Sequence, residues 1–339
     1  MHMSDALLSP AVGLGFHAAS AGLLAVSARR AAREDGYERR LPVMGVLGAF
    51  VFAAQMVTFA IPGTGSSGHL AGGTLLAIVL GPSAAFLVMA SVLTVQALFF
   101  ADGGLLALGC NVFNLGFWPA FVGVALYRRA NRAVPGGAGL LAGTIASSVV
   151  SLELGALGVV AQTALSGRAD VPVGDLALLM AGIHLPVAIV EGVVTAGVVR
   201  LVSRVAPDRV AVAPDRAPRI PVLATLAGIA LSLGTLAASF ASTLPDGLTW
   251  SVSRSARGGG PAEHAGGLAA ALHRVQDRLA FLPGYSFRGS ERHPGLDPGT
   301  VTSGLVGALL VALAVLAVAG LAAAARRSSR AGRARAPRT

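Results

Sequence analysis

The first two residues of the chain carry groups that can chelate one metal ion together. The sequence begins MHMSDALLSP, so His2 directly follows Met1. The free amine of Met1 and the amide nitrogen of His2 can close a five-membered ring on an ion, and that amide nitrogen and the imidazole Nδ1 can close a six-membered ring. Ni(II), Cu(II) and sometimes Co(II) displace an amide proton and accept this planar all-nitrogen set, whereas Zn(II) prefers tetrahedral sites. The position of His2 therefore predicts a site for one of these three ions.

His69 is the candidate for the fourth nitrogen. It lies in the stretch IPGTGSSGHLAGG, whose glycines let a backbone approach a ligand closely. Ser66 or Ser67 is expected to cap the helix that follows, and Ser67 is also a candidate for orienting the ligands. The positive end of that helix disfavours a cation, so nitrogen lone pairs must hold the ion. Either histidine alone could lack a role in metal binding. His2 could follow Met1 by chance, and His69 could be an ordinary loop or capping residue.

The composition is that of a membrane protein. Of the 339 residues, 54% are hydrophobic and 12% are charged, and apolar stretches of about 18 or more residues recur. We therefore expect an all-α, polytopic transmembrane helical bundle. The chain has no lysine, which excludes a Walker A loop. Its one cysteine, Cys110, excludes an internal disulfide and a thiolate zinc cluster.

The apolar stretches predict about nine membrane spans. They are expected at 9–28, 41–60, 69–81, 83–101, 105–127, 137–165, 174–202, 220–242 and 300–325. Arginines gather after the first, fifth, seventh and ninth of these. The positive-inside rule then places the N-terminus outside, on the same side as His69, and the C-terminus in the cytoplasm. The residues before the first span carry no positive charge, so a cleaved signal peptide is not expected.

Two amides are expected near the metal site. Asn111 and Asn114 lie in the stretch ADGGLLALGCNVFNLG. Buried amides need hydrogen-bond partners, and these two could hold the N-terminal segment in place and so orient the ligands. Plain hydrogen bonding between helices is the alternative.

Ionisable residues inside the predicted spans offer a different function. Glu153 and Glu191 fall within spans, where carboxylates are costly and often functional. His184 and Glu191 are seven residues apart and so share one helix face. They could form a proton relay or a second metal site, although a structural hydrogen bond, such as one between Glu191 and Thr195, is the simpler alternative.

Four separated stretches of the chain occur in a recognisable order. They are MHMSDALLSP, PGTGSSGHLAGG, LGPSAAFLVMASVLTVQALFFADGGLLALGCNVFNLG and HLPVAIVEGVVTAGVV. Together they resemble the CbiM/NikM substrate-binding subunits of energy-coupling-factor (ECF) nickel and cobalt transporters. The resemblance implies a metal-binding membrane domain of about seven helices at 1–204, in which the amine of Met1, His2 and His69 bind the ion. Ala6 stands where many members have glycine, which affects the loop and not the ligands.

The rest of the chain resembles a second module. FASTLPDGLTW and FLPGYSF are similar to segments of the PDGLE (NikN/CbiN-like) accessory module, although Thr249 stands at the position of the final acid. The expected PDGLE domain spans 220–325, with two helices and a large outer loop. A cytoplasmic linker at 205–219 precedes it, and a basic cytoplasmic tail at 326–339 follows it.

The resemblance implies a transporter subunit and not an enzyme. The chain would capture Ni(II) or Co(II) outside a prokaryotic cell, as a multi-pass protein of the cell membrane that binds neither nucleotide nor nucleic acid. Its partners would be an integral-membrane coupling subunit and two cytoplasmic ATPase subunits. The small residues Gly45, Ala49 and Ala53, spaced by four, would either contact the coupling subunit or pack within the bundle.

Two questions stay open in the sequence. The same nitrogens bind nickel and cobalt, so their pattern does not choose between the metals. A proton-coupled secondary transporter or channel that uses His184, Glu191 and Glu153 is the alternative function. An intramembrane metalloenzyme would need an HExxH-like pair on a helix, which the sequence lacks.

Overall fold

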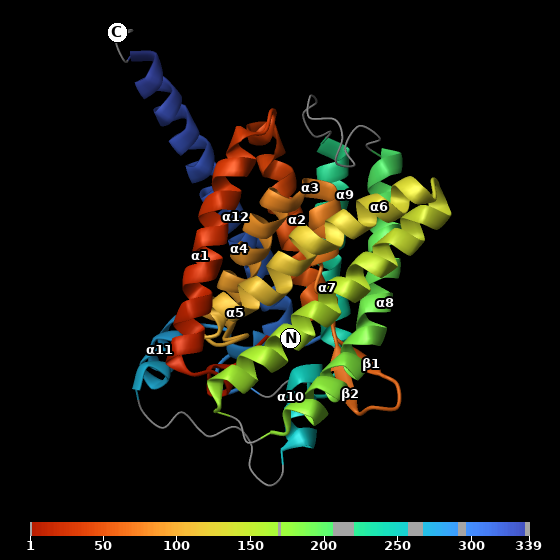
Figure 1. Ribbon diagram of the computed structural model, residues 1–339, viewed down its shortest axis with the longest axis vertical. Helices are drawn as coiled ribbons and strands as arrows, with labels where there is room; N and C mark the ends of the chain where they lie inside the picture. Colours follow the sequence, from red (N-terminus) through yellow and green to blue (C-terminus); the bar gives the residue numbers. More distant parts are fainter. Residues whose placement is uncertain (1, 169–170, 206–219, 257–266, 291–295, 336–339) are drawn as a thin grey trace.

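The computed structural model is a tall bundle of helices with a small β-hairpin near one end (Figure 1). It describes residues 2–168, 171–205, 220–256, 267–290 and 296–335, and most of the predicted linker lies outside these. The first part of the chain contains η1 (Asp5–Leu7), α1 (Pro10–Arg33), α2 (Tyr37–Met56), β1 (Phe59–Ile61), β2 (Ser66–Gly68), α3 (Gly73–Leu80), α4 (Pro82–Phe100), α5 (Leu108–Val112), the π-helical η2 (Phe113–Gly123), α6 (Val124–Ala133), α7 (Gly137–Ser166) and α8 (Val173–Val205). The second part contains α9 (Ile220–Ser232), η4 (Leu233–Ala237), η5 (Ala238–Phe240), α10 (Gly247–Ser255), α11 (Gly267–Leu279), η6 (Pro283–Tyr285) and α12 (Pro298–Arg335). The predicted all-α class is confirmed.

Within the described residues, seven helical segments are long and apolar enough to cross a membrane, two fewer than predicted. They are Pro10–Arg33, Pro82–Phe100, Leu108–Ala133, Gly137–Ser166, Val173–Ser203, Leu223–Phe240 and Pro298–Ser328. The predicted spans that are missing from this set correspond to α2 and α3. The eight residues of α3 extend about 12 Å, well short of the roughly 30 Å hydrocarbon core. Charged residues occupy the first turn of α2, and most of its apolar residues are buried against other helices.

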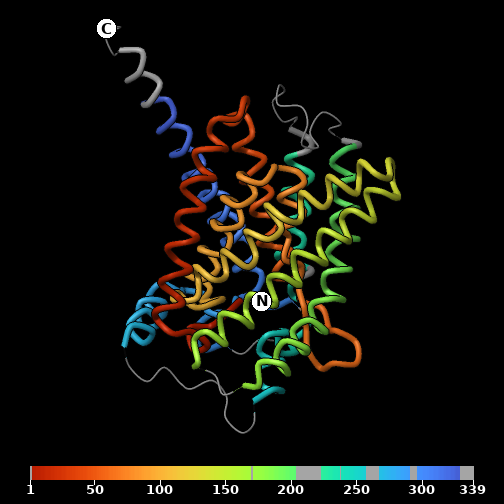
Figure 2. Tube along the Cα trace, in the orientation of Figure 1, coloured from red at the N-terminus to blue at the C-terminus, as the bar shows by residue number. Residues whose placement is uncertain are grey.

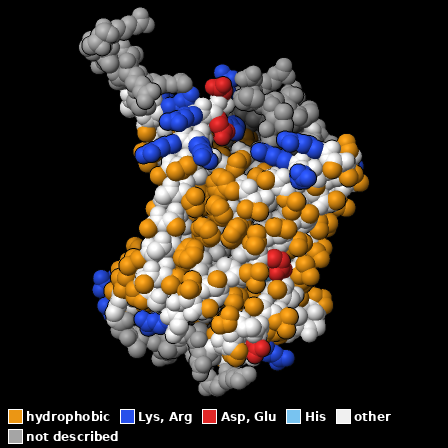
Figure 3. Space-filling view, viewed as in Figure 1, with side chains coloured by type: hydrophobic (Ala, Val, Ile, Leu, Met, Phe, Trp, Pro, Cys, Tyr) orange, Lys and Arg blue, Asp and Glu red, His pale blue; other side chains and the backbone are white. Residues whose placement is uncertain are grey.

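The surface of the bundle fits a membrane protein. On the face shown in Figure 3, apolar side chains cover the middle, and arginines gather toward the end where α12 finishes. The β-hairpin and α10 lie at the opposite end (Figure 1). The positive-inside rule associates the arginine-rich end with the cytoplasmic side of a membrane and the hairpin end with the outer side.

The last helix belongs to the core of the bundle. α12 contacts α1, α2 and α4, and the colours of Figure 2 show this late part of the chain beside the earliest helices. A Cβ placed on Gly48 of α2 would lie 3.1 Å from side-chain atoms of both Val311 and Val315, so a small residue permits this close approach. The hydroxyl of Tyr37 also donates to the Ala319 carbonyl, at 3.3 Å. The two modules therefore pack as one body.

The small-residue face of α2 is covered within the chain. Gly45 lies beside Leu316 of α12, and Ala53 lies beside Gly234 of η4. Both are buried, and Ala49 is half-buried. The sequence left two uses open for these residues: contact with a coupling subunit or packing within the bundle. The structure shows packing within the bundle.

A glycine and a carboxylate fix the start of α3. Gly72 precedes the helix with φ at 76°, and a Cβ there would lie 2.7 Å from Val51. The Glu191 carboxylate on α8 accepts a hydrogen bond from the Ala71 backbone N–H, at 2.7 Å. Ser66 and Ser67 lie in β2, several residues before the helix, so the prediction that one of them caps α3 was wrong.

Candidate metal centre

The N-terminal segment is held by the loop between α4 and α5. Asn111 accepts from the Met3 backbone N–H at 2.8 Å and donates to the Met3 carbonyl at 3.3 Å. The N–H of Gly104 donates to the same carbonyl, at 2.9 Å. Asp5 accepts from the Ala107 N–H, at 2.9 Å. These bonds fix the backbone next to His2, whereas Met1 lies outside the described residues.

Two glycines allow this close approach. A Cβ on Gly104 would lie 1.8 Å from the Asp5 carboxylate. Gly103 has φ at 82°, and a Cβ there would lie 2.8 Å from the Asn111 amide nitrogen and 3.5 Å from the Cβ of His2. A side chain at either position would push the N-terminal segment away from its seat.

His69 follows the β-hairpin and faces His2. Their rings are stacked, with centroids 5.4 Å apart and planes inclined by 21°. The Nδ1 of His69 lies 3.0 Å from the Leu70 carbonyl. Because a carbonyl only accepts hydrogen bonds, Nδ1 carries the proton and Nε2 keeps its lone pair. The structure thus brings together two of the three predicted ligand residues.

Burial favours the neutral form of both imidazoles. The His2 side chain is 8% exposed, and burial lowers its pKa below the usual 6.5. Burial lowers the pKa of His69 to about 4. Near neutral pH both rings therefore have a lone pair to offer to a cation.

The residues predicted to orient the ligands have different positions. Asn111 contacts the N-terminal segment as described above. Asn114 instead pairs with Gln162 of α7 through two amide hydrogen bonds, at 2.8 and 3.1 Å. This is hydrogen bonding between helices, the alternative to a role in orienting the ligands. Ser67 bonds to the second module: its N–H donates to the Pro245 carbonyl and its hydroxyl to the Leu244 carbonyl, both at 2.8 Å.

The PDGL segment of the second module covers the candidate site. Asp246 forms an isolated β-bridge with Ser67 and caps α10 by accepting from the N–H groups of Leu248 and Thr249. Between the modules lies a cavity of about 320 Å³. Its lining includes His2, Gln55, Met56, Thr58, Ser67, His69, Asp102, Ser242, Asp246, Tyr285 and Thr300. The two histidines thus share this cavity with polar groups of both modules.

Asp102 links His2 to the second module. One oxygen of its carboxylate lies 3.5 Å from the Nδ1 of His2, and the other accepts from the Tyr285 hydroxyl at 2.5 Å. The sequence prediction missed Asp102, although an acid directly after the apolar stretch VQALFFA was a signal that could have identified it.

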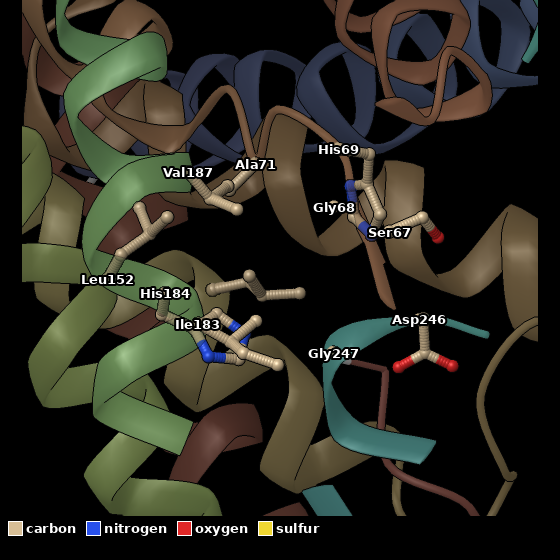
Figure 4. A pocket seen from close by; sticks show the side chains of 11 residues that line it. Ser67, Gly68, His69, Ala71, Leu152, Ile183, His184, Val187, Asp246 and Gly247 are labelled. Atoms are coloured by element: carbon tan, nitrogen blue, oxygen red, sulfur yellow. The ribbon is translucent and has the colours of Figure 1, made fainter. Parts of the chain in front are cut away.

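Two residues of the alternative relay, His184 and Glu191, have local hydrogen-bond partners. A smaller pocket of about 20 Å³ lies between His69 and His184, with Asp246 at its edge (Figure 4). The Nδ1 of His184 lies 2.7 Å from the Met180 carbonyl of its own helix. Glu191 accepts from the Ala71 N–H, two residues before α3 begins, and Glu153 is half-buried on α7. Among the described residues, no three side chains of His, Cys, Asp or Glu are grouped to hold a metal.

Comparison with known proteins identifies both modules. Residues 2–209 match the family described as the cobalt uptake substrate-specific transmembrane region (CbiM), and residues 221–324 match the PDGLE domain. A chain of Archaeoglobus fulgidus named as a fused nickel transport protein NikMN is 32% identical over 92% of this chain and 95% of its own length. The cobalt transport protein CbiM of Sorangium cellulosum is 32% identical over 61% of this chain and 93% of its own.

The fold also matches a solved structure. The crystal structure of a truncated transition metal transporter has a TM-score of 0.53 and 32% identity, over 60% of this chain and 99% of that one. The chain therefore belongs to the CbiM/NikM family of cobalt and nickel transport proteins, and it carries a fused PDGLE domain.

Proposed function

We propose that this chain is the substrate-capture subunit of an ECF importer for Ni(II) or Co(II). It binds the ion on the outer side of a prokaryotic cell membrane, through the amine of Met1, the amide nitrogen and Nδ1 of His2, and Nε2 of His69. The observation that carries the proposal is the stacked pair of imidazoles, kept neutral by burial, at the end of the bundle away from most of the arginines.

Binding in this arrangement releases protons. The terminal amine loses its proton if it is charged, and the amide nitrogen of His2 loses its proton to the solvent when the ion takes its place. The two fused rings leave one in-plane position, which Nε2 of His69 fills. The affinity order of divalent ions favours nickel over cobalt at such nitrogens, so discrimination between them rests on the shape and rigidity of the site.

Energy for import comes from partner proteins in this proposal. The chain has no lysine and therefore no Walker A loop. An integral-membrane coupling subunit and two cytoplasmic ATPase subunits would bind and hydrolyse ATP, and this chain would present and release the ion.

Uptake of radioactive nickel by cells tests the importer role. Cells that produce the chain with its coupling and ATPase subunits should accumulate the metal, and an inactive ATPase or His69→Ala should stop accumulation. Uptake by the chain without ATPases, sensitive to Glu191→Gln, would contradict the proposal and support the proton-coupled alternative.

A further inference from the structure

The helix α11 of the second module carries an exposed apolar stripe. Leu268, Leu272, Val275 and Leu279 follow one another at spacings of four, three and four residues, which places them on one face of the helix. Leu268, Val275 and Leu279 are 39%, 46% and 43% exposed, and Leu272 is half-buried. Single exposed apolar residues are ordinary, but a continuous stripe indicates an apolar partner.

The other sides of α11 differ from one another. On one flank of the stripe, the buried Gln276 faces the bundle. On the other flank lie Arg274 and Arg278, one helical turn apart and both exposed. Opposite the stripe, Asp277 and His273 form an ion pair with a separation of 3.5 Å when the imidazole is protonated. The helix therefore presents an apolar side, a basic side and a polar side in turn.

The bonds of Gln276 fix the height of α11 along the bundle. Its Nε2 donates to the carbonyl of Ala97, in the last turn of α4, at 2.8 Å, and to the carbonyl of Gly103, just beyond that helix, at 2.7 Å. The 19 residues of α4 extend about 28 Å, close to the roughly 30 Å hydrocarbon core of a bilayer. The middle of α11 therefore lies level with the boundary between hydrocarbon and headgroups.

The segment after α11 lies at the same height, at the periphery of the molecule. Phe281 is half-exposed, and its ring lies 5.7 Å from that of Phe99 and 6.1 Å from that of Phe100, at the end of α4. Figure 1 shows α11 at the edge of the bundle, at the end away from the C-terminus. Figure 3, in the same orientation, shows arginine and apolar side chains together at that edge. Surrounding lipid can therefore reach the stripe.

We infer that α11 lies in the outer surface of the lipid bilayer, with Leu268, Val275 and Leu279 at the acyl-chain boundary and with Arg274 and Arg278 bound to lipid phosphates. A bilayer surface offers an apolar layer, an anionic layer and water in the order in which α11 presents its matching sides. Guanidinium groups bind phosphate through paired hydrogen bonds, while their methylene groups remain over apolar surface. This inference concerns lipid and is independent of the proposed metal binding.

Such a position connects the bilayer surface to the loop that receives the N-terminal segment. Gln276 holds the carbonyl of Gly103, and a Cβ on Gly103 would lie 3.5 Å from the Cβ of His2. A helix supported by lipid thereby supports loop 101–107 from outside the bundle.

Site-specific labelling of the purified full chain tests the inference. The one cysteine, Cys110, is buried, so a cysteine introduced by Val275→Cys can be labelled selectively with a fluorophore, and the unaltered chain shows the background. The protein is placed in nanodiscs of phosphatidylcholine and phosphatidylglycerol without partner subunits. The label at position 275 should lose emission to nitroxides carried on lipid acyl chains and should be shielded from iodide in solution.

Two further positions calibrate this measurement. Asp277→Cys is the matched control, because its side chain is 54% exposed but lies on the opposite face of α11. Its label should lose emission to iodide and keep it in the presence of lipid nitroxides. Leu309→Cys replaces an exposed residue of α12 within a candidate membrane span, and it gives the response of a position that faces lipid.

The outcomes separate the possible occupants of the stripe. Equal quenching by iodide at positions 275 and 277 would overturn the inference and leave the stripe for a partner protein. Shielding of position 275 from both quenchers would also overturn it, because protein would then cover the stripe.

A charge reversal tests the two arginines separately. In the Val275→Cys chain, Arg274→Glu together with Arg278→Glu should reduce quenching by lipid nitroxides, because carboxylates are repelled by lipid phosphates. Unchanged quenching in this variant would overturn the assignment of the arginines to the phosphates.

Discussion

At the scale of residues, the site is built from two imidazoles that stay neutral because they are buried. His2 and His69 stack at 5.4 Å. Nδ1 of His69 bonds to the Leu70 carbonyl, which leaves Nε2 of that ring for the proposed metal ion.

The lowered pKa of His69 predicts a pH dependence of stability. In the unfolded chain His69 takes up a proton near its usual pKa of 6.5, but in the folded chain only near about 4. The stability that depends on its neutral form is therefore complete above pH 6.5 and is lost as the pH falls toward 4. Thermal unfolding of metal-free protein above and below this window should show the loss, and His69→Gln should reduce it. Equal losses in the two proteins would contradict the assignment.

Substitution of Asn111 is expected to weaken metal binding, whereas substitution of Asn114 is not. Asn111→Ala removes both hydrogen bonds to Met3 and should weaken Ni(II) binding by about 10- to 100-fold. Asn114→Ala breaks only the pair with Gln162 and should lower thermal stability without a comparable effect on affinity. Isothermal titration of both purified variants compares them directly, and equal losses of affinity would refute the distinction.

At the scale of elements, glycine loops bring the ligand segments together. Loop 101–107 receives the N-terminal segment, and the hairpin of β1 and β2 presents His69. The eight-residue helix α3 begins at Gly73, four residues after His69, and Glu191 holds the intervening backbone at Ala71. These loops place polar backbone at the end of the bundle, where it can be hydrated or bonded to other loops.

Gly104 gives a test of this arrangement. Gly104→Ala puts a Cβ 1.8 Å from the Asp5 carboxylate, so we expect the N-terminal segment to shift and Ni(II) affinity to fall at least about tenfold. Gly182→Ala is the control, because nothing lies within 4 Å of a Cβ at that helical position. Unchanged affinity in Gly104→Ala would show that the position of the N-terminal segment against loop 101–107 does not determine Ni(II) binding.

The sequence singled out His2 and His69, which the structure brings together, but not the residues around them. His2 was identifiable because the proposed chelate depends on neighbouring atoms in the chain, and long apolar runs identified each of the seven segments that could span a membrane. The pairing of Gln55 with Gln96, and of Ser67 with Pro245, depends on residues far apart in the chain, which no local pattern specifies. The predicted span at 41–60 omitted the first turn of α2, whose residues Glu38, Arg39 and Arg40 make this helix less apolar than a membrane span.

At the scale of the whole molecule, the PDGLE domain is integrated with the CbiM domain. α12 packs along α2, Tyr285 bonds to Asp102, and the PDGL segment bonds to Ser67. The second domain therefore forms one wall of the cavity that contains both histidines.

This packing predicts that the covalent link between the domains is dispensable for their association. A chain divided within 206–219, with each part expressed separately in the same cells, should copurify in detergent because α12 remains packed on α2. A tag on one half and detection of the other measure this. Recovery of either half alone would contradict the predicted packing.

The central claim is that the N-terminal amine and His2 chelate the metal, and one comparison tests it most directly. Ni(II) and Co(II) affinities should be measured for the purified chain and for a form with two residues added before Met1, which moves His2 away from the terminus. The extended protein should stay folded and lose binding. Equal affinity in the extended protein would contradict the central claim and place the metal elsewhere in the chain.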